Sequence, residues 1–126
     1  ALRHRQCLDM AAQLNKTAFD LERSAHYAMA QKLYEQALEI KQLNLAKDDP
    51  EIASQTLDVA RTCAAQTNYT QAQSLYESAL SLLRKKPRID SSLTKQALEN
   101  YGQMLNQINQ QEKAKKIYDE ARELSK

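Results

Sequence analysis

Small and aromatic residues recur along the chain at spacings of three and four, which place them on one face of an α-helix. After Ala30, for example, Tyr34 follows four residues later and Ala37 three residues after that. Short polar stretches separate the segments that carry such a face. The pattern predicts helices over the following ranges: about 3–24, 27–45, 50–66, 69–84, 91–108 and 111–125.

One phrase of the sequence occurs three times at a fixed spacing. Tyr34, Tyr76 and Tyr118 lie 42 residues apart. Each is preceded by Ala four positions earlier and followed by Ala three positions later, and the flanking alanines are Ala30, Ala37, Ala72, Ala79, Ala114 and Ala121. A fixed period of this length predicts one supersecondary unit that is repeated and stacked. We interpret the tyrosines as core residues of the stack.

The repeated phrase resembles the second helix of a tetratricopeptide repeat, whose consensus places Ala, an aromatic residue and Ala at this spacing. The first helix of that repeat carries a large, an apolar, a small and a large residue, and the third unit matches with Leu98, Tyr101, Gly102 and Leu105. The resemblance implies an all-α fold, a right-handed α-solenoid of six helices in three antiparallel hairpins. The hairpins would span about 3–45, 50–84 and 91–125 of a single domain, 1–126.

The period of 42 residues is similar to the longer repeats of the kinesin light chain group, and so is the connection over 45–53. In that connection Asp49 is expected to cap a helix that has Pro50 at its first position. In the second connection, over 85–91, Asp90 or Ser91 is expected to cap the helix that follows. Because glycine is absent from the turns inside the hairpins, we expect Asn to take the left-handed conformation there.

Composition narrows the classes of partner and of reaction. Net charge is +2, from 18 basic and 16 acidic side chains, which does not favour a nucleic-acid binder. No apolar run approaches the roughly 20 residues of a membrane span. Cys7 and Cys63 do not form a disulfide framework, so a reduced, cytoplasmic setting is expected. Because the chain begins at Ala1, we expect a fragment of a longer protein, and an upstream targeting signal stays open.

Candidate chemistry is sparse. There is no glycine-rich phosphate loop, no pair of histidines and no nucleophile beside a base, so neither an enzyme nor a cofactor is predicted. His4 and Cys7 lie one turn apart, but two ligands without a second pair make a poor metal site. The basic cluster over 84–88 could touch phosphate or acidic protein, although a solvated connection is the simpler interpretation.

The resemblance implies a concave groove lined by the first helix of each hairpin. Helical geometry then selects the stripe that faces the groove. The candidate partner-binding residues are Leu8, Asn15, Phe19, Arg23, Leu57, Asp58, Arg61, Gln96, Asn100 and Gln103. Ala12, Ser54, Ala65, Glu99 and Gln107 belong to the same stripe.

Two parts of this groove suggest how a partner would bind. Phe19 with Leu8 and Ala12 could form an apolar anchor pocket, or an upstream repeat could cover this face instead. Asn100 matches an Asn that kinesin-light-chain-like repeats place in the groove. The amides around it could bond the backbone of an extended peptide, or they could be solvated surface groups.

The sequence therefore predicts a protein–protein interaction module that holds a peptide or helix of a partner in its groove. The alternative is a structural segment of a longer solenoid that self-associates through its end faces. The last helix motivates that alternative, because Ile117, Tyr118, Ala121 and Leu124 are expected to lack a covering helix.

Overall fold

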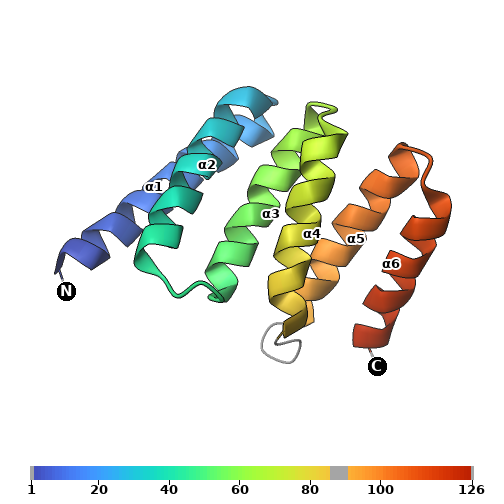
Figure 1. Cartoon of the computed structure of the whole chain (residues 1–126). Helices are drawn as coiled ribbons and strands as arrows, with labels where there is room; N and C mark the ends of the chain where they lie inside the picture. Colours follow the sequence, from blue (N-terminus) through green and yellow to red (C-terminus); the bar gives the residue numbers. More distant parts are fainter. Residues whose placement is uncertain (1, 86–90, 126) are drawn as a thin grey trace.

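A computed structural model describes residues 2–85 and 91–125, and within these ranges the chain forms six α-helices (Figure 1). They are α1 (Leu2–Arg23), α2 (Tyr27–Asn44), α3 (Pro50–Ala65), α4 (Tyr69–Lys85), α5 (Ser91–Gln107) and α6 (Gln111–Leu124). Each lies within about two residues of its predicted range. The all-α prediction is confirmed.

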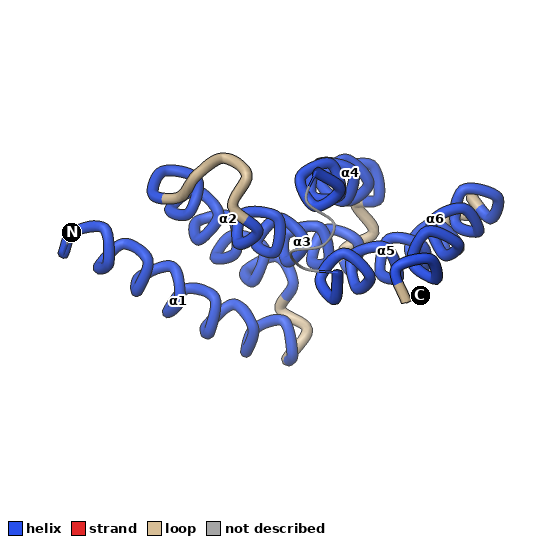
Figure 2. The backbone as a smooth tube through the Cα atoms, turned by 90° about the horizontal axis from the view of Figure 1, so that it is seen from below, coloured by secondary structure: helices blue, strands red, loops and turns tan. Residues whose placement is uncertain are grey.

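The helices stack as three successive hairpins. Helix α1 packs on α2, α3 on α4 and α5 on α6, while α2 contacts α3, and α4 contacts α5. Seen from below, with the stack running across the view, α1, α3 and α5 follow one another on one side, and α2 and α4 lie on the other (Figure 2). This arrangement is the predicted α-solenoid, and it places the first helices of the three hairpins on a common surface.

The recurring small and aromatic residues form the core. Tyr34 and Tyr76 are buried, as are the alanines that flank them. At the close-contact position of the first helices, Ala18 and Ala60 are fully buried. At the third such position, Gly102 lies directly under the ring of Tyr118. The tyrosine stripe is therefore part of the packing, as interpreted from the sequence.

The connection between the first two hairpins has the predicted cap. The Asp49 side chain accepts a hydrogen bond from the backbone N–H of Glu51 at 2.9 Å, and Pro50 is the first residue of α3. A capping carboxylate and a proline at this position both favour a helix start. Asp90 and residues 86–88 of the basic cluster lie outside the described residues.

The turns inside the hairpins differ from the expectation that Asn would be left-handed. The left-handed residues are Ala25, Thr67 and Asn109, with φ of 65°, 64° and 64°, so the expectation is right at the third turn alone. Each turn closes the preceding helix with backbone hydrogen bonds, as when His26 N–H donates to Leu21 O at 2.8 Å. This pattern satisfies helix-end carbonyls and offsets the modest cost of a non-glycine residue in this conformation.

Among the described residues, none of the helices has the length and apolarity needed to cross a membrane.

Candidate functional site: the concave groove

A hollow of about 730 Å³ opens on the side of the molecule formed by the first helices of the hairpins. Its lining comes from α1, α3 and α5, together with one residue of α2. The lining residues are Ala12, Asn15, Lys16, Phe19, Glu22, Tyr34, Asp58, Arg61, Gln96 and Asn100. Six of the ten residues predicted from the sequence therefore share one hollow, which we call the groove.

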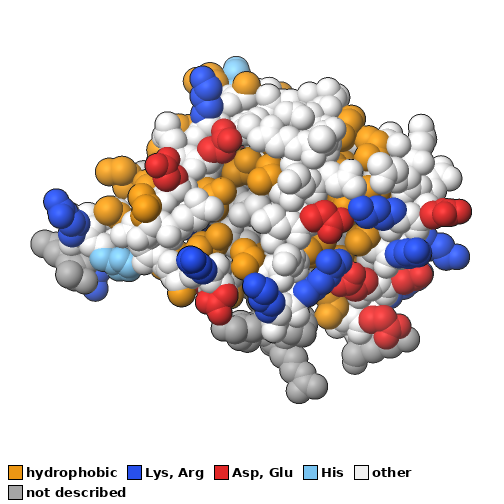
Figure 3. All heavy atoms as spheres, viewed as in Figure 1, with side chains coloured by type: hydrophobic (Ala, Val, Ile, Leu, Met, Phe, Trp, Pro, Cys, Tyr) orange, Lys and Arg blue, Asp and Glu red, His pale blue; other side chains and the backbone are white. Residues whose placement is uncertain are grey.

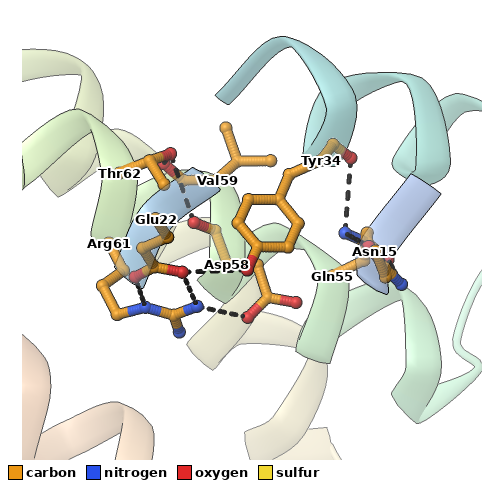
Figure 4. Close-up of polar contacts among 8 residues, drawn as sticks. All are labelled: Asn15, Glu22, Tyr34, Gln55, Asp58, Val59, Arg61 and Thr62. Carbon is orange, nitrogen blue, oxygen red and sulfur yellow. Dashed lines mark hydrogen bonds and ion pairs between the residues drawn. The ribbon is translucent and has the colours of Figure 1, made fainter. Parts of the chain in front are cut away.

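A cluster of charged and polar side chains crosses the groove between the first and second hairpins (Figure 4). Arg61 of α3 donates to both carboxylate oxygens of Glu22 in α1, at 2.5 and 2.8 Å. Its Nη2 also lies 2.9 Å from Oδ1 of Asp58. The hydroxyl of Tyr34 donates to Glu22 at 2.8 Å. We call Glu22, Asp58 and Arg61 the charged triad.

The pKa values of the triad members are shifted in different directions by burial and by their mutual contacts. Burial alone would raise the pKa of Glu22, but the hydrogen bonds and positive charge of Arg61, with the Tyr34 hydroxyl, hold it below its ordinary value. Burial raises the pKa of Asp58, and the single contact with Arg61 offsets this incompletely. The hydrogen bond to Glu22 raises the pKa of Arg61, so the guanidinium stays charged.

An amide pair forms a second bridge between the same hairpins. Asn15 of α1 and Gln55 of α3 exchange two hydrogen bonds of 2.8 and 2.9 Å, and Gln55 also donates to the carbonyl oxygen of Tyr34 at 3.3 Å. Gln55 is fully buried, and this pairing satisfies its amide. Asn15 was predicted as a ligand-binding residue, but its amide is already committed to holding two hairpins together.

Phe19 lies in the groove and is 52% exposed. The guanidinium carbon of Arg23 sits 5.8 Å from the centre of the Phe19 ring, within range of a cation–π contact. Leu8 is half-buried and does not line the hollow, whereas Ala12 does. The structure therefore presents Phe19 as an apolar side chain among polar ones and does not form the expected apolar pocket with Leu8.

A smaller hollow of about 370 Å³ continues the groove along α3, α4 and α5. Arg61 and Asn100 line both hollows, which joins them into one surface. The predicted residue Gln103 lies here, beside Tyr69 and Met104. This section carries amides and apolar groups where the first section carries charges.

Leu57 was predicted to line the groove, but the structure places it in the core. It is 7% exposed and belongs to the hydrophobic core. Helix α3 is the central first helix and contacts α2, α4 and α5, so it buries a wider arc than the terminal first helix α1. A stripe defined on α1 therefore includes one core position when it is transferred to α3.

Three lining residues escaped the sequence analysis: Lys16, Glu22 and Tyr34. Lys16 lies 42 residues before Asp58, so the repeat register itself pointed to the groove. Glu22 and Tyr34 had no such signal, because their role depends on the long-range contact with Arg61. Sequence patterns report positions along one helix and do not report side-chain partners across helices.

The end face beyond α6 also differs from the expectation. Ile117 and Ala121 are buried within the third hairpin, and Tyr118 and Leu124 are half-buried. The outward hollow of this face is lined largely by polar and charged groups: Lys95, Glu99, Asn106, Gln111, Lys115, Tyr118, Ala121, Arg122 and Ser125. One of these, Arg122, stands 42 residues after the buried Leu80. The expectation of an uncovered apolar end is wrong for Ile117 and Ala121, because α5 covers them.

The outer face has a different character from the groove. Figure 3 shows side chains of both charges over this face, gathered most densely toward α6, and exposed hydrophobic atoms toward α1 and α2. Met29 and Leu43 of α2 are exposed hydrophobic residues, Leu43 at 78%.

Within residues 2–85 and 91–125, no group of three His, Cys, Asp or Glu side chains could hold a metal ion. Cys7 and Cys63 are both free, and Cys63 is buried in the core.

Comparisons with known proteins agree with this architecture. A protein of Podosopora anserina, named as a kinesin light chain with nearly identical TPR-like repeats, has a crystal structure similar in fold, with a TM-score of 0.76. Identity is 17%, over 91% of this chain and 55% of that chain. A single-residue variant of the same protein gives a TM-score of 0.77 at 18% identity, over 90% of this chain and 54% of that chain. This chain thus spans about half the length of those structures.

Curated proteins provide no match to this sequence. The family model described as Tetratricopeptide repeat matches residues 9–85 and again residues 51–126. The two matches overlap and together span nearly the whole chain, including all three copies of the Ala, Tyr and Ala phrase. The chain therefore belongs to the tetratricopeptide repeat family.

Proposed function

We propose that this chain is an interaction module that binds an extended segment of a partner protein in the groove. Tetratricopeptide repeats generally mediate protein–protein interaction, and their fold is a scaffold type without catalytic chemistry. The observation that carries the proposal is the shared hollow, to which the first helices of all three hairpins contribute side chains. A surface assembled from separate repeats exists only when the solenoid is folded, and it matches the reach of an extended ligand.

The chemistry of the groove supports a peptide ligand. Phe19 offers a half-exposed ring, and aromatic groups in such positions dominate interface energies. Asn100, Gln96 and Gln103 line the two hollows and offer both donors and acceptors to a peptide backbone. The polar end face beyond α6 gives self-association less support than the sequence suggested.

The test is a selection of binding peptides from a displayed random library, followed by affinity measurements on Phe19→Ala. Because the Phe19 ring is half-exposed, we expect the variant to stay folded and to lose about tenfold in affinity. Leu43→Ala is the matched control, since it removes an exposed hydrophobic side chain from α2 on the outer face. It should bind as the natural sequence does.

The opposite results would contradict the proposal. Peptides that bind Phe19→Ala and the natural sequence equally, or that lose affinity with Leu43→Ala instead, would place the working surface outside the groove. Sedimentation over a range of concentrations distinguishes the alternative. A mass that rises with concentration, together with unchanged peptide binding in Phe19→Ala, would favour self-association.

A further inference from the structure

The repeat register brings three different side chains to one row across the groove. Lys16, Asp58 and Asn100 are spaced 42 residues apart, so they occupy the same position of α1, α3 and α5. All three line the same hollow. A ligand that crosses the first helices along this row therefore meets a cation, then a carboxylate, then an amide.

The carboxylate of Asp58 is incompletely neutralised. Arg61 is the cation of the charged triad, and it uses two nitrogens on Glu22 and one contact on Asp58. Two carboxylates against one guanidinium leave one negative charge in excess. Figure 4 shows the second carboxylate oxygen of Asp58 directed away from the guanidinium. Further from the triad, Lys41 of α2 contributes a weaker positive field at Asp58.

Lys16 presents the opposite case. Its side chain is exposed at the α1 edge of the groove. Ion pairs in the part of the chain that the structure describes include those of Glu22, Asp58, Glu77, Asp119 and Glu120, and Lys16 takes part in none of these. The groove therefore offers an available cation at its α1 edge and an excess anion at its centre.

We propose that the partner segment carries an acidic residue that faces Lys16 and a basic residue that faces Asp58. The inference rests on the proposed groove function and specifies its ligand. Neighbouring helices lie roughly 8–10 Å apart, and an extended chain advances about 3.3 Å per residue. The two charged residues of the partner are then separated by about three positions. Beyond them, Asn100 bonds the backbone of the segment.

Charge complementarity is the reason to expect this pattern instead of an all-acidic or all-basic ligand. An all-acidic segment would place like charge against Asp58, and an all-basic segment would place it against Lys16. Like charges across an interface are strongly unfavourable, so Asp58 rejects the all-acidic ligand and Lys16 rejects the all-basic one.

The first part of the experiment examines the peptides selected from the displayed random library. We expect enrichment of sequences with Asp or Glu about three residues from Lys or Arg, in one direction along the peptide. Selected peptides that depend on Phe19 but lack this charge pattern would overturn the inference while leaving the proposed function intact. A failure to recover any peptide that depends on Phe19 would overturn the proposed function itself.

The second part is a charge exchange with one enriched peptide. Lys16→Glu should weaken binding of the peptide by only about fivefold, because Lys16 is exposed and solvent screens its ion pair with the acidic residue of the peptide. Replacing the acidic residue of the peptide by Lys should restore affinity for Lys16→Glu and reduce it for the natural sequence. Lys32→Glu is the matched control, since Lys32 is also exposed, lies on α2 and changes net charge equally.

Asp58 is tested separately because it also contacts Arg61. Asp58→Asn should lower the affinity for the same peptide about tenfold. A peptide whose basic residue is replaced by a neutral one should bind Asp58→Asn and the natural sequence with equal affinity. If Lys16→Glu and Lys32→Glu had equal effects, the response would come from net charge alone. That result would contradict the assignment of the acidic residue to Lys16.

Discussion

The two interfaces between hairpins share a register but are held by different chemistry. At the first interface, between the first and second hairpins, the charged triad and the Asn15–Gln55 amide pair join α1 to α3. At the second interface, the rings of Tyr76 and Tyr101 stack with centres 5.2 Å apart. Helix α4 contacts α5 there through a largely apolar core.

The repeat register shows how this difference arises. Gln55 in α3 is replaced by Ala97 in α5, and Val59 is replaced by Tyr101. Arg61 of the triad is replaced by Gln103. The backbone is repeated while the stabilising side chains are exchanged, so a partly buried polar network at one interface takes the place of an aromatic stack at the other. This also leaves charge in the first section of the groove and amides in the second.

The largest expected effect comes from the aromatic stack. Tyr101 is fully buried, so Tyr101→Ala should lower the free energy of unfolding by about 3–5 kcal/mol through lost burial and a cavity. Urea unfolding followed by circular dichroism measures the change. Val59→Ala, at the same register of α3, should cost about 2 kcal/mol because less surface is lost. Equal losses at the two positions would show that the interfaces do not differ in this way.

Tyr101→Phe refines the same experiment. It keeps the stacked ring and removes the hydroxyl, which donates to Glu77 at 2.5 Å. The expected loss is about 1 kcal/mol. A loss as large as that of Tyr101→Ala would assign the second interface to the hydrogen bond and not to the aromatic stack.

The charged triad should give a smaller loss. Arg61→Met leaves Glu22 and Asp58 close together without their shared cation. Since the Arg61 side chain is 35% exposed, solvent limits the expected loss to about 1–2 kcal/mol. The triple variant Glu22→Gln, Asp58→Asn, Arg61→Met should recover most of it, because no unpaired charge remains.

Gln103→Met is the counterpart of Arg61→Met at the second interface. Gln103 is exposed, so we expect a change within about 0.5 kcal/mol. If Arg61→Met were equally silent in urea unfolding, the triad would contribute no stability to the first interface, and its role would lie in the groove alone.

The dependence of stability on pH separates the two carboxylates of the triad. The pKa of Glu22 is lowered in the folded state from an ordinary value of 4.5. The Glu22 carboxylate therefore stabilises the fold above pH 4.5, and this stabilisation is lost as the pH falls through the lower pKa of the folded state. The pKa of Asp58 is raised from 3.8, so its charge costs stability at neutral pH and this cost disappears in acid. The two groups act with opposite sign.

We therefore expect Glu22→Gln to destabilise and Asp58→Asn to stabilise the protein at neutral pH. Both differences should shrink as the pH falls from about 5 to about 3. At the second interface the pKa of Glu77 is also lowered, against burial, by hydrogen bonds from Tyr101 and Lys113. Glu77→Gln should therefore destabilise the protein at neutral pH, as Glu22→Gln does. No counterpart of Asp58→Asn exists at the second interface, because the equivalent position holds Asn100, which does not titrate. Destabilisation by Asp58→Asn would contradict the direction of its pKa shift.

Local signals predicted the repeated parts of the molecule well. The Ala, Tyr and Ala phrase identified the buried faces, and Asp49 with Pro50 identified the start of α3. Ala25 and Thr67 were not predicted as left-handed residues, since backbone hydrogen bonds and not side-chain preference set the turns. The sequence therefore predicts those features that the conformational preferences of nearby residues determine, such as helix starts and buried helix faces.

The groove was predictable only in part, because its chemistry depends on contacts between repeats. Phe19 and Arg61 were placed correctly by helical geometry. Glu22 was not, since its role comes from a partner 39 residues away. Leu57 was misplaced because the central helix is covered on more sides than α1. Periodicity along one helix does not describe what neighbouring helices bury.

A small net effect, from two opposing contributions, is expected at the end face of the third hairpin. A methyl group at Gly102 would lie 2.9 Å from Cζ of Tyr118, too close unless the ring moves. Tyr118 is half-buried and faces the hollow of the end face, so its ring has room to shift. Alanine in a helix is favoured over glycine by about 1 kcal/mol, and displacement of the ring offsets this gain. Gly102→Ala should therefore change the free energy of unfolding by less than about 1 kcal/mol.

A second variant isolates the two contributions to that small effect. In a Tyr118→Leu background the close contact is absent, and Gly102→Ala should stabilise the protein by about 1 kcal/mol. Ala18 and Ala60 show that the first two hairpins accept a methyl group at the same register. A loss above about 2 kcal/mol in the natural background would mean that the Tyr118 ring is held in place. The end face would then be as firmly packed as the two interfaces, and Gly102 would be required there by the fixed ring.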